Sequence, residues 1–135
     1  GLAEACRFLE KIGMVEIEFY ERSWGRKAVD RIRAIPDVHL IGPPGDAEAE
    51  GSLVSLRMGD LHPHDLAVLL DARGVMCRAG HHCTMPLHEH FGGEASLRAS
   101  GYLYNDEEDL DRLVDALSFA RKALRGEVST PFSIS

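Results

Sequence analysis

Apolar residues recur at spacings of three and four over residues 1–36, which predicts a long amphipathic helix. Gly13 interrupts this pattern, and Pro36 ends it because proline disfavours helical geometry in the residue before it. We expect Trp24 to anchor this helix in the core or at a domain interface. Half of the helix is free to pack on something outside the chain.

Two more helices are expected further along the chain. One opens at residues 62–65, where a proline and an acid suit the first turn of a helix. The other follows Asn105, an N-cap residue with Glu108 at the reciprocal position of a capping box. Its predicted buried stripe consists of Leu110, Leu113, Val114, Leu117, Ala120 and Leu124. Gly126 is expected to end this helix.

Four segments between the helices have strand-like composition. They cover residues 38–41, 52–58, 75–78 and 97–104. A small sheet with helices on one face accommodates this order of elements, so the expected fold class is α/β, an α+β sandwich. We expect residues 1–126 to form one domain, with residues 1–36 as its long bridging helix and 127–135 as a flexible tail. The pattern does not predict the order of the strands.

Composition restricts the function classes. The chain has 135 residues, of which 44% are hydrophobic, and its net charge is −7. A negative surface repels phosphate backbones and anionic lipids, so no nucleic-acid or membrane partner is expected. The longest unbroken apolar run, residues 66–70, is far shorter than a membrane span. The three cysteines cannot all pair, which favours a reducing, cytoplasmic setting.

Periodicity disappears over residues 79–93, where histidines concentrate around Cys83. The cysteine lies in a glycine-flanked loop beside His81, His82 and Arg78, and such neighbours lower the pKa of a thiol. Because the thiolate is the nucleophilic form, Cys83 is a candidate nucleophile. The alternative is a small apolar residue in a loop that happens to be rich in histidine. The other cysteines, Cys6 and Cys77, are expected to be buried small hydrophobes.

The same loop has a second interpretation, a metal site. Its possible ligands are His81, His82, Cys83, His88 and His90. Their spacing matches no closed zinc motif, so we expect no metal. Downstream, Arg98 is either a partner of a neighbouring acid or a bidentate clamp for a substrate carboxylate. Arg78 has the same two interpretations.

Residues 78–83, Arg-Ala-Gly-His-His-Cys, with Met-Pro-Leu at 85–87, resemble the active-cysteine loop of SUF-type (group II) cysteine desulfurases and selenocysteine lyases. The run from Arg98 to Asn105, with the acidic stretch 107–111, is similar to the carboxyl-terminal signature of that family. The resemblance covers residues 1–126. Gly101 and Tyr102 depart from the family pattern, in which a larger apolar residue and a short step are usual.

The resemblance implies the small, carboxyl-terminal domain of a fold type I pyridoxal-phosphate enzyme of the class V aminotransferase family. In that family the lysine that holds the cofactor belongs to the large domain. The chain has three lysines, Lys11, Lys27 and Lys122, all on predicted helical stretches without the sequence context of a cofactor lysine. We therefore expect pyridoxal phosphate in the complete enzyme but no cofactor lysine in this chain.

The resemblance also implies roles for individual residues. Cys83 would take the sulfur of L-cysteine as a persulfide, and Arg98 would clamp the substrate carboxylate with help from Arg78. His81 and His82 would shape the loop and share protons. The implied function is sulfur mobilisation for iron-sulfur cluster assembly.

The implied partners are the missing large domain, L-cysteine and a sulfur-acceptor protein, and the chain alone is expected to be inactive. An apolar face left exposed on the first helix predicts self-association or dependence on a partner. The alternative function is a non-enzymatic sulfur carrier or binding module that is persulfidated on Cys83.

Overall fold

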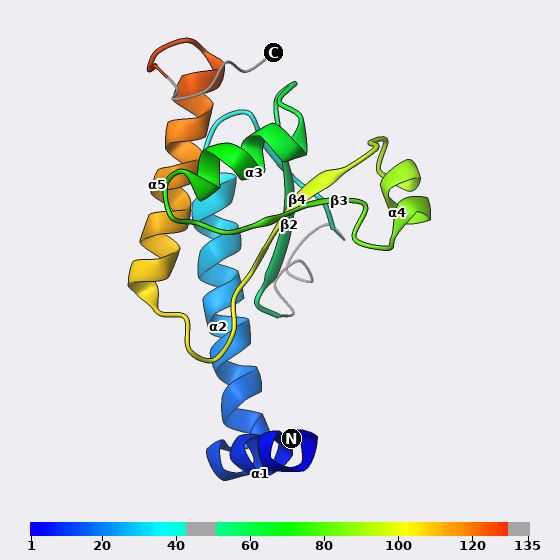
Figure 1. Ribbon diagram of the computed structural model, residues 1–135, viewed down its shortest axis with the longest axis vertical. Helices are drawn as coiled ribbons and strands as arrows, with labels where there is room; N and C mark the ends of the chain where they lie inside the picture. Colours follow the sequence, from blue (N-terminus) through cyan, green and yellow to red (C-terminus); the bar gives the residue numbers. More distant parts are fainter. Residues whose placement is uncertain (43–50, 130–135) are drawn as a thin grey trace.

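Four strands form one antiparallel sheet in the order β1-β2-β4-β3. The computed structural model describes residues 1–42 and 51–129. In chain order the elements are α1 (Leu2–Ile12), α2 (Met14–Arg33), β1 (Val38–Leu40), β2 (Leu53–Met58), α3 (Pro63–Asp71), β3 (Arg78–Gly80), α4 (Met85–His90), β4 (Ser96–Ser100) and α5 (Glu107–Leu124). Helices α2, α3 and α5 lie together beside the sheet, and α4 lies beyond its β3–β4 end (Figure 1).

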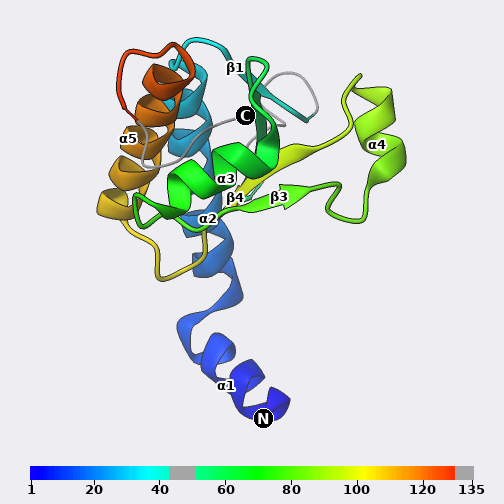
Figure 2. The ribbon, with the colours of Figure 1, turned by 45° about the horizontal axis from the view of Figure 1, so that its top comes forward.

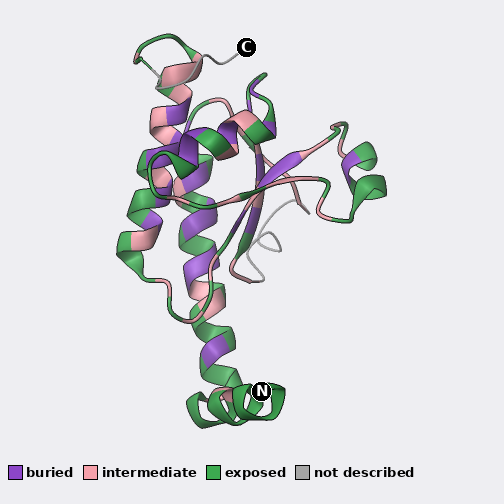
Figure 3. Ribbon diagram, viewed as in Figure 1, coloured by how far each residue is buried: buried purple, intermediate pink, exposed green. Residues whose placement is uncertain are grey.

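The alternation of side chains along the strands separates a covered face from an open face. Val54, Leu56 and Met58 of β2 are buried, as are Leu97 and Ala99 of β4. These side chains pack with the apolar stripes of α2, α3 and α5 into one core. The burial is concentrated where these helices meet the sheet (Figure 3). The predicted α/β class, with helices on one face, is confirmed.

The interruption at Gly13 is a complete break between two helices. Gly13 has φ 101°, which is far from helical geometry and which residues other than glycine rarely adopt. Helix α1 consequently leaves the axis of α2 and extends away from the sheet (Figures 1 and 2). The expectation of one long helix over residues 1–36 is therefore wrong. The second helix ends at Arg33, before Pro36.

Two strand boundaries differ from the prediction. The apolar segment 75–77 is not paired in the sheet, and β3 begins only at Arg78. Val75 instead donates its backbone N–H to the carbonyl of Leu70, which ties the segment to the end of α3. The strand expected over 97–104 ends at Ser100, because the following residues turn toward α5.

The N-cap of α5 is Asp106, one residue later than predicted. Its side chain accepts hydrogen bonds from the backbone of Glu108 and Asp109, and Asp109 completes the capping box. Asn105 instead closes the turn before the helix by accepting a hydrogen bond from the backbone of Tyr102. The predicted buried stripe of α5 is present, with Val114 and Leu124 partly buried.

Parts of the prediction lie outside the described residues. These are residues 43–50 of the segment 42–51, which its prolines, glycines and acids predict to be a surface loop, and residues 130–135 of the expected tail. Within the described ranges, no helix combines the length and the apolar character that a membrane crossing requires.

Trp24 is a core residue. Its ring is buried, and its Nε1 donates to the backbone oxygen of Asp106 at 3.3 Å. A Cβ atom on Gly101 would lie 2.8 Å from this ring, so the glycine at this departure from the family pattern makes room for the indole.

Gly25, the residue after Trp24, lets the backbone of Gly51 lie close to helix α2. A Cβ atom on Gly25 would lie 1.8 Å from the backbone oxygen of Gly51. We expect Gly25→Ala to lower the free energy of unfolding by about 1–3 kcal/mol, since the clash is with backbone. The shift of the urea midpoint measures this. The control is Arg26→Ala at the next, exposed position, which should change stability by less than about 0.5 kcal/mol.

Candidate functional site

The open face of the sheet brings two arginines together. Arg98 of β4 pairs with Ser55 of β2 on one side and with Arg78 of β3 on the other. Directly opposed residues in an antiparallel pair share a face, so Arg78 and Arg98 are cross-strand neighbours. Two guanidinium groups on directly opposed residues repel each other. An anion that binds between or beside them relieves this repulsion, so this part of the sheet favours a negatively charged ligand.

A pocket of about 210 Å³ opens beside Arg98 on this face. It is lined by Ile41, Leu53, Ser55, His82, Thr84, Leu87, His88, Ser96 and Arg98. Two buried atoms, Nε of Arg98 and Nδ1 of His82, have no hydrogen-bond partner among the described residues. An unpaired buried polar group costs about 1–3 kcal/mol, and more when it is charged. The pocket therefore presents unused hydrogen-bonding capacity to a polar ligand.

The loop between β3 and α4 carries Cys83 at the surface. Two of its residues have positive φ angles, His82 (53°) and Cys83 (64°), as has Gly80 (128°) at the end of β3. This conformation is unfavourable for residues with a side chain. Thr84 stabilises the turn, because both its backbone N–H and its hydroxyl donate to the carbonyl of His81, at 2.8 and 2.7 Å. The side chain of Cys83 is exposed, while its neighbours His82 and Thr84 line the pocket.

The orientation of His82 follows from its one hydrogen bond. Its Nε2 lies 3.1 Å from the carbonyl oxygen of Ser96, which can only accept. Nε2 therefore carries a hydrogen, and in the neutral ring Nδ1 is left as an acceptor at the pocket wall. Burial lowers the pKa of His82 below its ordinary value; the hydrogen bond to the Ser96 carbonyl opposes this shift, and the positive charge of Arg98 adds to it. His82 is thus neutral at physiological pH.

We expect the His82 ring to titrate below pH 6.5 in a pH series of imidazole NMR spectra. At pH values between the folded pKa of His82 and 6.5, its imidazole binds a proton more readily in the unfolded chain than in the folded chain. The contribution of His82 to the free energy of unfolding should therefore be greatest above pH 6.5 and fall as the pH drops through that window. Urea unfolding at several pH values, compared with His82→Asn, measures this. A folded pKa at or above 6.5 would contradict the assignment.

The other predicted loop histidines have different surroundings. His81 is exposed, and its ring lies edge-on to His88 with 6.0 Å between centroids. His88 is buried, and both of its ring nitrogens have partners: the Thr84 carbonyl at 3.0 Å and the Ser96 hydroxyl at 2.9 Å. His90 packs against Phe91. Among the described residues, no three histidine, cysteine or acidic side chains converge as a set of metal ligands.

The remaining cysteines lie away from this site. Burial raises the pKa of Cys77 to about 11, so its thiol is protonated at neutral pH and is a weak nucleophile. Cys6 is exposed on α1, so its predicted burial is wrong. Cys6 is exposed because α1 does not pack on the core: none of the residues of this helix is buried against the described part of the chain.

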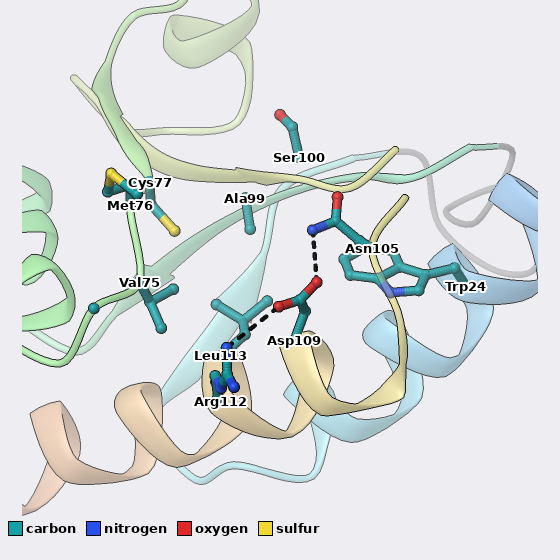
Figure 4. Close-up of a pocket in the computed structure, with 11 residues that line it drawn as sticks. Trp24, Val75, Met76, Cys77, Ala99, Ser100, Asn105, Asp109, Arg112 and Leu113 are labelled. Carbon is teal, nitrogen blue, oxygen red and sulfur yellow. Dashed lines mark hydrogen bonds and ion pairs between the residues drawn. The ribbon is translucent and has the colours of Figure 1, made fainter. Parts of the chain in front are cut away.

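A second pocket of about 220 Å³ lies between the segment 74–77, the end of β4 and the start of α5 (Figure 4). Its polar wall is a chain of mutual contacts. Asn105 donates to Asp109 at 2.9 Å, and Arg112 lies 3.7 Å from the same carboxylate. Cys77 and Trp24 contribute to its lining. These contacts stabilise the start of α5. Because the polar groups are paired with each other, they are less available to a ligand than the unpaired groups at Arg98.

The lysines do not suit a Schiff-base role at the open face. Lys27 of α2 forms an ion pair with Glu107 of α5, on the helical side of the sheet. Lys11 lies on α1 and Lys122 on α5. Among the described residues, the three lysines thus lie on α1, α2 and α5, whereas the open face carries the guanidinium of Arg98 and the neighbouring loop carries the thiol of Cys83.

Sequence reasoning missed three residues of the site. Ser55 and Ser96 line the pocket, and His88 was considered only as a metal ligand. The two serines come next to Arg98 and His82 through strand pairing and loop return, which short motifs do not encode. The contact between Thr84 and His88 could have been predicted, because residues four apart in a helical turn lie next to each other.

Comparison with known proteins gives a family match and several sequence relatives. Residues 1–113 match the family model described as aminotransferase class V. The chain is 44% identical over 122 residues to a cysteine desulfurase of Haloferax volcanii, covering 90% of this chain and 28% of that protein. It is 43% identical over 117 residues to a probable cysteine desulfurase of Staphylococcus aureus strain Mu50, covering 87% and 28% respectively. The chain thus spans about 28% of the length of these relatives.

Solved structures show the same fold. The apo structure of a cysteine desulfurase from Thermococcus onnurineus NA1 superimposes with a TM-score of 0.79 at 30% identity, covering 87% of this chain and 29% of that one. The cysteine desulfurase CsdA from Escherichia coli, an S-sulfonic acid form, gives a TM-score of 0.78 at 28% identity, covering 87% and 28%. The fold, the sequence relatives and the family match lead to one conclusion: this chain belongs to the class V aminotransferase family.

Proposed function

We propose that this chain is the carboxyl-terminal small domain of a pyridoxal-phosphate-dependent cysteine desulfurase. In this proposal Cys83 takes the sulfur of L-cysteine, and Arg98 binds the substrate carboxylate. The observation that carries it is the buried, unpartnered Nε of Arg98, in a pocket that both neighbours of Cys83 line. A carboxylate is the natural partner of such a guanidinium, because it accepts two parallel N–H bonds.

The charges around the pocket support an anionic substrate. Arg78 lies directly across the strands from Arg98 and adds positive potential on the same face of the sheet. The hydroxyl-bearing Ser55 pairs with Arg98 on the other side and lines the same pocket. In the proposed role Arg98 makes the direct clamp, and Arg78 assists at the same carboxylate.

The proposed transfer conserves atoms. The carbon–sulfur bond of L-cysteine breaks, a sulfur–sulfur bond to Cys83 forms, and the released carbon gains a proton to give alanine. His82 is neutral and presents an acceptor nitrogen at the pocket wall, so it is suited to receive a proton from a thiol nearby. His81, exposed on the same loop, shapes the turn through its carbonyl.

The proposal assigns the cofactor to residues outside this chain. It is supported by the position of the three lysines on helices α1, α2 and α5, so the proposed contribution of this chain is the nucleophile and the clamp. We propose that the large domain of the complete enzyme supplies the cofactor. The exposed Cys83 leaves a persulfide within reach of a sulfur-acceptor protein, in iron-sulfur cluster assembly.

A chimaera tests the proposal. In it, this chain replaces the matching 28% of the Staphylococcus aureus relative. The chimaera with pyridoxal phosphate, L-cysteine and a thiol reductant should form alanine and sulfide in equal amounts. The isolated chain should form no more than pyridoxal phosphate alone. An inactive but folded chimaera that binds the cofactor would contradict the proposal.

The exposure of Cys83 also suits the second candidate function, a sulfur carrier without catalysis of its own. Incubation of the isolated chain with a complete desulfurase distinguishes the two. A carrier gains a persulfide on Cys83, detectable by mass spectrometry as added sulfur, whereas a small domain alone is a poor acceptor.

We expect the isolated chain to self-associate. Exposed apolar side chains gather on α1 and the start of α2, including Leu2, Phe8, Met14, Val15 and Phe19. An exposed apolar surface of this kind marks a partner interface or drives association. Sedimentation at increasing concentration should show species larger than the monomer, and Phe8→Glu with Phe19→Glu should reduce them. A clean monomer at high concentration would contradict this expectation.

A further inference from the structure

We propose that His88 is a positioning residue that holds the loop carrying Cys83 against the strand carrying Arg98. The inference rests on the function proposed above. In the described part of the chain, only two polar side chains are buried, and they are His88, 4% exposed, and its partner Ser96. A buried polar pair at the boundary of a candidate site calls for an explanation, because burial of polar groups is costly unless each is satisfied.

The hydrogen bonds of His88 define its orientation. Nδ1 lies 3.0 Å from the carbonyl oxygen of Thr84, which can only accept, so Nδ1 carries the hydrogen. In the neutral ring, Nε2 is then an acceptor for the hydroxyl of Ser96 at 2.9 Å. The imidazole thus bridges two groups from separate elements, and both of its nitrogens are used.

The two bridged groups adjoin the two functional side chains. Thr84 directly follows Cys83, and Ser96 lies two residues before Arg98 on the same face of β4. A single ring therefore couples the position of the thiol to the position of the guanidinium. His82 makes a separate tie from the loop to the backbone oxygen of Ser96, so the attachment does not depend on His88 alone.

The loop requires such an attachment. His82 and Cys83 both have positive φ angles, and such conformations are unfavourable for residues with a side chain and persist only where the surroundings enforce them. His88 is not a member of the main apolar core. Loss of its ring should therefore loosen the loop, which His82 still ties to Ser96, while leaving the fold in place.

Directed alkylation of the purified chain tests the inference. Iodoacetate and iodoacetamide alkylate a thiolate in the same way, with loss of iodide, but only iodoacetate carries a carboxylate for Arg98. The readout is the ratio of the two rates at Cys83, followed by mass spectrometry. Exposed Cys6 in the same molecule gives the reference ratio, and protection of Cys77 reports that the fold is intact.

We expect the wild-type ratio at Cys83 to exceed that at Cys6 by about tenfold, through binding of the anion beside the thiol. His88→Ala should bring the ratio down toward that of Cys6. His88→Asn should restore part of it, because the amide of asparagine can donate to the Thr84 carbonyl as Nδ1 does. Arg98→Gln should abolish the preference.

A wild-type ratio retained in His88→Ala, with Cys77 protected, overturns the positioning role alone. No preference for iodoacetate in the wild type overturns the proposed anion site, and the inference with it. If His88→Ala exposes Cys77, the comparison passes to Ser96→Ala, which removes one bond of His88 and keeps the carbonyl that binds His82. An unchanged ratio in that variant overturns the inference.

Discussion

Cys83→Ala in the Staphylococcus aureus chimaera is expected to reduce sulfide and alanine formation by roughly a thousandfold or more. Removal of a nucleophile that forms a covalent intermediate typically has an effect of at least this size. The loss should fall on kcat, because the alanine variant keeps Arg98 and the pocket that binds the substrate carboxylate. Initial rates of alanine and sulfide release measure kcat and KM, and mass spectrometry detects the persulfide intermediate on Cys83.

The chain provides matched controls for this prediction. Cys77→Ala removes a thiol whose pKa burial raises to about 11, and Cys6→Ala removes an exposed thiol on α1. Both variants should keep activity within about twofold, since neither side chain touches the pocket at Arg98. Equal loss in Cys77→Ala and Cys83→Ala would show that general thiol chemistry or misfolding, rather than a nucleophile at Cys83, explains the effect.

Much of the fold could be predicted because burial follows apolar periodicity. The stripe of α5 and the alternation in β2 are strong signals, and both elements form where expected. The segment 75–77 shows the limit of that reasoning, since Val75 and Cys77 are apolar and partly buried but Val75 hydrogen-bonds outside the sheet. An apolar pattern reports contact with the core and does not report backbone pairing, which also explains why strand order could not be derived.

The site divides in a similar way. The loop sequence predicts Cys83 and its neighbours as candidates, and Arg98 is a candidate because it is an arginine within an otherwise apolar or small-residue segment. Ser55 and Ser96 carry no sequence signal, because their roles come from register with Arg98 and from the return of the loop. His88 was visible only as a possible ligand, since its burial depends on how α4 sits at the end of the sheet.

Arg98→Lys in the chimaera is expected to raise the KM for L-cysteine by about 10- to 100-fold. Hydrogen bonds to charged groups contribute about 1.5–3 kcal/mol, and lysine lacks the planar fork that binds a carboxylate bidentately. The position is demanding because Arg98 lines the pocket and its buried Nε has no hydrogen-bond partner among the described residues, and a lysine ammonium has no donor at that place. Steady-state kinetics over a wide range of L-cysteine concentration measures this change.

The control is Arg112→Lys, an exposed residue of α5 that pairs with Glu108, and it should leave KM unchanged. The division between KM and kcat carries the mechanistic meaning. A clamp that binds the carboxylate equally before and during the reaction changes KM alone, whereas a clamp that also aligns the sulfur with Cys83 lowers kcat as well. Because His88 couples the two side chains through Thr84 and Ser96, we expect a further, smaller loss in kcat. An unchanged KM in Arg98→Lys would remove the carboxylate clamp from the proposal.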